Sequence, residues 1–82
     1  MTGATVSDAY LLGISEGRDL LRTLQAQGGY NPAIDAPAML ASARLGLKGQ
    51  SGTMAQVARG EIDFWRNQCA KLQREGVSHA QA

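Results

Sequence analysis

The feature that most constrains this chain is a pair of adjacent large aromatic residues, Phe64 and Trp65, in its longest helix-like segment. Successive side chains on a helix point about 100° apart, so the two rings cannot share one narrow apolar stripe. One ring can belong to the core, and the other then needs a second surface to cover it. The segment 53–75 is therefore predicted to be a helix that is contacted on two sides.

The chain has only 82 residues with which to build that core. Small domains commonly gain stability from disulfides, a metal or oligomerisation. Cys69 is the single cysteine and His79 the single histidine, which excludes an internal disulfide and a zinc site of four Cys or His ligands. We expect no metal and no cofactor. Oligomerisation is therefore the remaining way in which a chain of this composition could gain stability.

Charge and hydropathy restrict the partners and the cellular compartment that the sequence predicts. The net charge is +1 and the basic residues are dispersed along the chain, which disfavours an electrostatic binder of nucleic acid or of membrane surfaces. No apolar run approaches the roughly 18 residues of a membrane span, and the N-terminus lacks an export signal. A lone thiol fits a reducing compartment. We therefore predict a cytoplasmic protein without a membrane partner.

The pattern predicts an all-α fold, because no alternating run and no hairpin-turn dipeptide occurs. Gly28-Gly29 and Gly76 are expected to end helices, and Asp35 and Thr53 to begin them. The expected helices, in a single domain 1–82, are 7–27, 36–47 and 53–75, with flexible ends at 1–5 and 77–82. We expect the two longer helices to pack antiparallel with the short middle helix beside them, in a chain that dimerises.

Two glycines, Gly13 and Gly17, lie on the apolar stripe of the first helix. Each costs about 1 kcal/mol relative to alanine in a helix interior. Their missing side chains allow another helix backbone to come close. We interpret them as a site of close packing against another helix of the same fold, with packing between two copies as the alternative.

The third helix has two apolar faces. The core stripe consists of Met54, Ala58, Ile62, Trp65, Cys69 and Leu72. Cys69 on this stripe acts as a small apolar residue, since no histidine lies near it to activate a thiol. Phe64 lies on the second face with Val57 and Gly60. Two interpretations of the second face stand: the middle helix covers it, or another chain does.

The third side of the same helix is charged. Arg59 and Arg66 flank Asp63 at helical spacing, which is typical of a solvated face. The two arginines are also the first candidates to meet an acidic protein or a phosphate. The predicted partner-binding residues are Val57, Arg59, Gly60, Phe64 and Arg66. We predict no catalytic residues and no enzyme, since no histidine lies near an acid and no phosphate-binding glycine loop occurs.

The segment 46–61 resembles the helix-turn-helix of lambda-type phage repressors. A turn of glycine and apolar residues is followed by a polar cap and by a helix that carries Arg59-Gly60-Glu61. The resemblance implies a recognition helix in the major groove of DNA. The chain departs from that pattern by two extra turn residues, Lys48-Gly49, and by a helix that continues far past Gly60. A DNA-binding transcriptional regulator is therefore the alternative function.

A second resemblance spans most of the chain. The pattern Tyr-Leu-x-Gly-x-x-Glu-Gly-Arg-x-Leu-Leu occupies 10–21, and Arg-Gly-Glu-x-Asp-Phe-Trp-Arg occupies 59–66. Together they are similar to small uncharacterised proteins encoded by bacteriophages and prophages. The resemblance implies a compact helical protein of the bacterial cytoplasm that acts by binding. The expected function is inhibition or scaffolding of a bacterial host protein or defence complex, and the expected partners are that protein, a second copy of the chain, or both.

Overall fold

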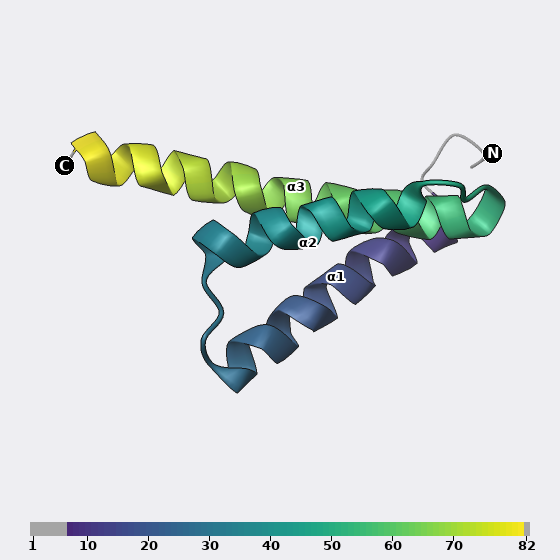
Figure 1. Cartoon of the computed structure of the whole chain (residues 1–82), viewed down its shortest axis with the longest axis horizontal. Helices are drawn as coiled ribbons and strands as arrows, with labels where there is room; N and C mark the ends of the chain where they lie inside the picture. Colours follow the sequence, from purple (N-terminus) through teal and green to yellow (C-terminus); the bar gives the residue numbers. More distant parts are fainter. Residues whose placement is uncertain (1–6, 82) are drawn as a thin grey trace.

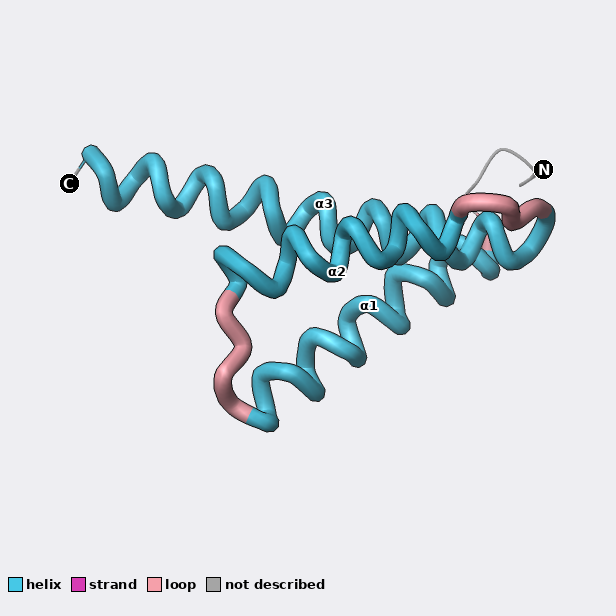
Figure 2. Tube along the Cα trace, in the orientation of Figure 1, coloured by secondary structure: helices cyan, strands magenta, loops and turns pink. Residues whose placement is uncertain are grey.

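Three helices make up the computed structural model, which describes the backbone of residues 7–81 and side chains as far as Arg74. They are α1 (Asp8–Gln27), α2 (Pro32–Leu47) and α3 (Gly52–Gln81), and no strand occurs between residues 7 and 81 (Figure 1, Figure 2). The all-α class with three helices is confirmed. The ends expected to be flexible at 1–5 and at Ala82 lie outside the described residues.

The start of α2 differs from the prediction. The helix begins at Pro32, because the side chain of Asn31 accepts a hydrogen bond from the amide of Ala33 at 3.1 Å. Proline is favoured at a first helical position, where its fixed φ angle suits the helix and no amide is needed. Asp35, the predicted cap, lies inside the helix and accepts a hydrogen bond from the Asn31 amide at 2.8 Å. Both side chains thus satisfy the free amides of the same helix end.

Glycines end α1 but not α3. Gly28 and Gly29 have left-handed φ angles of 78° and 83°, which terminate α1 as predicted. Gly76 was expected to end the third helix, but α3 runs through it to Gln81. A glycine permits a left-handed turn without enforcing one, and in a helix interior it costs only about 1 kcal/mol relative to alanine.

Both α1 and α2 pack on α3, and they do not pack on each other. Within the described helices, no Cα atom of α1 lies within 8 Å of a Cα atom of α2. Figure 1 shows α2 running antiparallel to α3, while α1 runs in the same general direction as α3 and diverges from α2. The expected antiparallel packing of the two longer helices is therefore corrected. Two short connections each reverse the chain, so the first and third helices share a direction.

The core lies along α3. Trp65 is 1 % exposed and Ile62 and Ala58 are each 6 % exposed, which confirms these members of the predicted stripe. Met54, assigned to the same stripe, is 60 % exposed, and its neighbour Ala55 occupies the buried position in the first turn of α3. The core is thus centred on one indole ring and surrounded by small side chains.

The crossing of α1 over α3 is a contact between backbones. A Cβ atom added to Gly13 would lie 2.9 Å from the carbonyl carbon of Val57 and 3.0 Å from the amide nitrogen of Glu61. One added to Gly60 would lie 3.0 Å from the Cα atom of Gly13. Such distances leave no room for a side chain on either helix. The interpretation of Gly13 as a site of close packing within the fold is confirmed.

Candidate partner-binding site

The second apolar face of α3 is covered by α1. Gly60 is buried, and Val57 and Phe64 are half-buried. A Cβ atom on Gly17 would lie 2.7 Å from Cδ2 of Phe64, so the Phe64 ring packs directly against the α1 backbone. Both earlier interpretations of this face, coverage by the middle helix and coverage by another chain, are replaced by coverage from α1. The physical reason is that Gly13 and Gly17 have no side chains to hold α1 away.

The two adjacent aromatic rings point to different neighbours. The ring centroids of Phe64 and Trp65 lie 5.0 Å apart with an interplanar angle of 87°, which is an edge-to-face arrangement. Phe64 packs on α1, whereas Trp65 lies at the base of a cavity between α1 and α2. The sequence argument that the two rings need two surfaces is confirmed.

The charged side of α3 contains one link to α1. Arg66 is 60 % exposed and its Nη1 atom lies 3.4 Å from Oδ1 of Asp63. The hydroxyl of Tyr10 donates a hydrogen bond to Oδ2 of Asp63, which joins the start of α1 to α3. That hydrogen bond, then burial and the charge of Asp63, raise the pKa of Tyr10, and the charge of Arg66 opposes the rise. Arg59 is exposed, and the expected Arg59–Asp63 ion pair is not among the salt bridges of the described residues.

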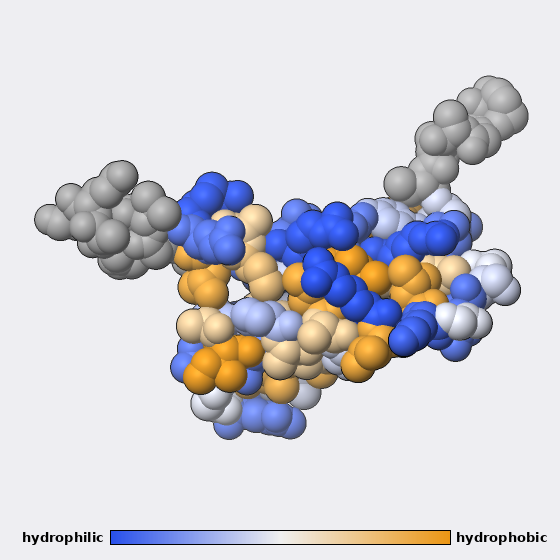
Figure 3. Space-filling model, turned by 45° about the horizontal axis from the view of Figure 1, so that its top comes forward, coloured by the Kyte–Doolittle hydropathy of each residue, from blue (hydrophilic) through white to orange (hydrophobic). Residues whose placement is uncertain are grey.

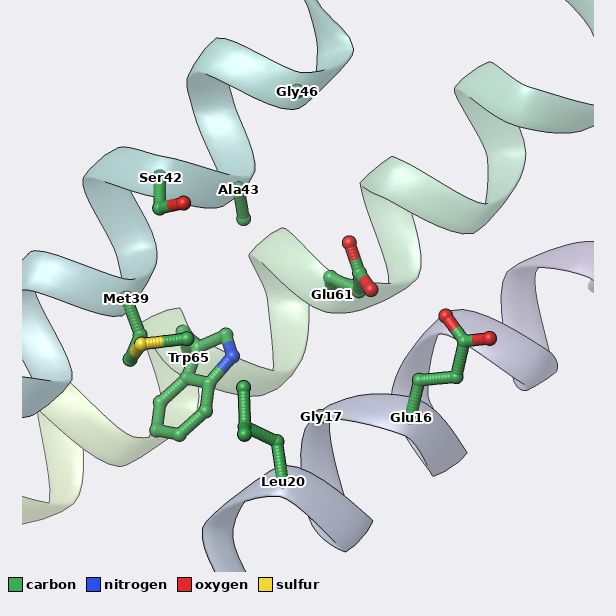
Figure 4. A pocket seen from close by; sticks show the side chains of 9 residues that line it. All are labelled: Glu16, Gly17, Leu20, Met39, Ser42, Ala43, Gly46, Glu61 and Trp65. Atoms are coloured by element: carbon green, nitrogen blue, oxygen red, sulfur yellow. The ribbon is translucent and has the colours of Figure 1, made fainter. Parts of the chain in front are cut away.

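A cavity of about 300 Å³ lies where α1 and α2 diverge above α3. We call it the groove. Its lining residues come from all three helices: Glu16, Gly17 and Leu20 of α1, Met39, Ser42, Ala43 and Gly46 of α2, and Glu61 and Trp65 of α3. Figure 4 shows the indole of Trp65 between Met39 and Leu20. The groove is therefore apolar at the Trp65 end and acidic at the other.

Two carboxylates define the acidic end of the groove. Glu16 projects from α1 and Glu61 from α3, so the pair bridges two helices (Figure 4). Burial, a hydrogen bond with Glu16 and the negative charge of Glu16 raise the pKa of Glu61, in that order of importance. Two carboxyl groups held together in a partly desolvated place favour a proton or a cation between them. The acidic end therefore suits an ammonium or guanidinium group.

The chemistry available elsewhere is limited. Among the described residues, no group of three His, Cys, Asp or Glu side chains is placed to hold a metal ion. Cys69 is half-buried on the core side of α3. A smaller cavity of about 150 Å³ lies at the far end of α1, between Leu21, Tyr30 and Leu72. Within the described part of the chain, no helix is both long and apolar enough to cross a membrane.

The groove itself was not predicted from the sequence, although two of its lining residues, Gly17 and Trp65, were expected to pack within the fold. Glu16 and Glu61 lie far apart in the sequence, and the structure pairs them across two helices. Leu20 and Met39 likewise lie on two different helices, and spacing within one segment does not relate them. The one local signal was Glu16-Gly17, since a residue next to a close-packing glycine must lie near the crossing helix. The partner of that residue depends on the crossing geometry, which local spacing does not define.

Comparison with known proteins returned no relative: no protein-family model, no curated protein and no solved structure matches this chain.

Proposed function

We propose that this chain is a helical protein-interaction module that binds a bacterial host protein in the groove and acts by occluding or scaffolding it. The observation that supports the proposal is the groove, an apolar hollow with a carboxylate pair, which lies between two helices whose Cα atoms nowhere come within 8 Å of each other. The resemblance of 10–21 and 59–66 to phage and prophage proteins supports the further proposal that this interaction takes place in the bacterial cytoplasm. Inhibition of a host enzyme or defence complex is the form of action that we propose.

The shape and chemistry of the groove favour a helix as the bound element. Three helices form two walls and a floor, which is the environment that a fourth helix occupies in a bundle. An amphipathic helix binds such a groove through apolar side chains at helical spacing. Leu20, Met39 and Trp65 offer the apolar contacts, and Glu16 with Glu61 offers a place for one lysine or arginine. The partner is therefore a basic amphipathic helix.

Protein binding accounts for the architecture better than DNA binding. In a helix-turn-helix the two helices cross at about 90–120°. Here α2 runs alongside α3 as an antiparallel hairpin (Figure 1), and Ala55 and Ala58 of the presumed recognition segment are buried against the fold. Arg59 is the exposed basic residue that this segment retains. We therefore retain DNA binding only as an outcome for the test to reveal.

The test uses a photoreactive residue at Ser42, which is exposed and lines the groove, in a bacterial lysate. The matched control carries the same residue at Thr53, which is exposed and does not line it. We expect one discrete host protein to be cross-linked from position 42 and not from position 53. Equal labelling from both positions, labelling of nucleic acid alone, or no labelling contradicts the proposal.

A second variant locates the contact. Gly46→Lys adds a cation from a position where a new Cβ atom meets no heavy atom within 4 Å, so the fold tolerates it. The amine then competes for the acidic end of the groove and should abolish cross-linking from position 42. Thr53→Lys adds the same charge away from the groove and should leave cross-linking intact. If Arg59→Ala abolishes capture while Gly46→Lys does not, the charged side of α3 is the site instead.

A further inference from the structure

The middle helix, α2, is apolar on more sides than the fold covers. Asp35 and Arg44 are its only charged residues. It packs on α3 with Ala36, which is fully buried, and with a stripe of half-buried residues: Leu40, Ala43 and Leu47. A helix that is apolar all round is normally buried on more than one side. The opposite side of α2 is therefore an apolar face without a neighbour in the described chain.

This outer face is a regular stripe, which we call the α2 stripe: Ile34, Ala38, Ala41 and Leu45. Spacings of four, three and four residues keep all four within about 60° of the helix surface, opposite the face that packs on α3. Ile34 is 65 % exposed and Leu45 is 71 % exposed, and the two alanines between them are exposed as well. Figure 3 shows one face of the whole molecule, on which apolar patches lie between hydrophilic residues.

We propose that the α2 stripe binds the α2 stripe of a second copy in antiparallel orientation. The stripe is symmetric about the midpoint between Met39 and Leu40. Antiparallel pairing about that point sets Ile34 against the partner's Leu45, and Ala38 against the partner's Ala41. Large residues then meet large ones at both ends, and small residues meet at the centre, where the helices approach closely. A two-fold axis requires this kind of self-complementary patch.

The charges of α2 select the antiparallel arrangement. Asp35 lies near one end of the helix, and Arg44 and Lys48 lie at the other. Antiparallel pairing brings the Asp35 end of each helix alongside the Arg44 end of its partner, at the same level on opposite flanks. The attraction is therefore long-range and not a salt bridge. Parallel pairing would place Arg44 beside the partner's Arg44 and align the two helix dipoles unfavourably.

The size of the interface sets the expected affinity. The 16 residues of α2 span about 24 Å at 1.5 Å per residue. One helix pair of that length buries less than the roughly 1,600 Å² of a standard interface, so association is weak. We expect a dissociation constant on the order of 10–100 µM. This interface is separate from the groove, so it does not depend on the function proposed above.

Sedimentation equilibrium of the full chain over about 5–500 µM measures the association. We expect Leu45→Glu to raise the dissociation constant at least about 100-fold, because the dimer would bury the new carboxylate twice. Leu12→Glu is the matched control, since Leu12 is 51 % exposed and lies on α1. It should leave the dissociation constant unchanged, and far-UV circular dichroism should show both variants folded. A monomeric parent across the whole range, or equal weakening by Leu12→Glu, overturns the proposal.

Disulfide cross-linking tests the orientation. In a Cys69→Ser background, chains with Ile34→Cys and chains with Leu45→Cys are oxidised separately and as a mixture. Antiparallel pairing predicts a disulfide-linked dimer in the mixture and little in either sample alone. A dimer that forms within the Ile34→Cys sample alone shows parallel pairing and overturns the proposed arrangement.

Discussion

A glycine-to-alanine substitution should lower the free energy of unfolding at Gly60, which lies in the crossing of α1 and α3, and raise it at Gly46, which lies outside the crossing. In Gly60→Ala, the new methyl group would lie 3.0 Å from both the Cα atom of Gly13 and the amide nitrogen of Ile14, with the carbonyl oxygen of Tyr10 nearer still. Carbon atoms in ordinary contact lie about 3.5–4.0 Å apart, so relief of the contact with the Gly13 Cα atom alone requires the helices to separate by about 0.5–1 Å. The closer carbonyl oxygen of Tyr10 requires at least the upper end of that range. The obstructing atoms belong to backbone, so no side-chain rotation can relieve the overlap.

The magnitude follows from two opposing effects. Overpacking of this kind costs about 1–3 kcal/mol or more, and the better helix propensity of alanine returns about 1 kcal/mol. Because backbone atoms obstruct the new methyl group, the overpacking cost lies at or above the upper end of that range, and we expect Gly60→Ala to lower the free energy of unfolding by about 2 kcal/mol. Gly46→Ala is the control, since a Cβ atom there meets nothing within 4 Å. It should raise the free energy of unfolding by about 0.5–1 kcal/mol, because only the propensity changes.

Urea denaturation followed by far-UV circular dichroism measures both variants against the parent. The double variant Gly13→Ala/Gly60→Ala should lose less stability than the two single losses combined, because one displacement of α1 relieves both overlaps. If Gly60→Ala is as stable as the parent, or is stabilised like Gly46→Ala, then α1 does not cross α3 at these glycines and the reasoning fails.

Three further predictions concern polar groups. Tyr10→Phe should lower the free energy of unfolding by about 1 kcal/mol through loss of the hydrogen bond to Asp63, and should have no such effect in an Asp63→Asn background. The pKa of Glu61 is raised in the folded state, so the folded parent loses stability as the pH rises above the ordinary value of 4.5. Glu61→Gln should therefore reduce the fall in melting temperature between about pH 4 and pH 8, and an unchanged slope would contradict this. Asn31→Ala should cost about 1 kcal/mol in urea denaturation, whereas Asn31→Asp, which keeps the capping acceptor, should cost little.

Local patterns were enough to predict three helices and the main core residue, but not the start of α2 or the end of α3. Trp65 and Ile62 share a stripe at helical spacing, and that spacing is a property of one segment alone. The start of α2 was also readable in principle, since Asn31-Pro32 is a favourable cap and first position. Asp35 is an equally good cap by residue type, and the sequence alone therefore offers two starts for this helix. The choice between two good caps depends on where the chain leaves the preceding turn.

The candidate site could not be predicted in the same way, because it depends on relations between helices. Glu16 meets Glu61 only because Gly13 and Gly60 let α1 approach α3 in one register. A single bulky residue at that crossing would move α1 and separate the carboxylates. Helix spacing fixes which residues share a face, but it does not fix which face of another helix they meet.

Because of the same crossing, the helix with an uncovered apolar face is α2 and not α3. The sequence pointed to α3, whose adjacent aromatic rings require two covered faces, and the fold covers both of them with α1 and α2. Those contacts use one face of α2 and leave Ile34 and Leu45 exposed on the other. Because α1 diverges from α2 after the glycine crossing, it cannot cover that face, and it leaves the groove open as well. If Gly60→Ala displaces α1, cross-linking through the groove should weaken. Association through the α2 stripe should persist, since the stripe lies opposite the face of α2 that packs in the fold and no Cα atom of α2 lies within 8 Å of one of α1.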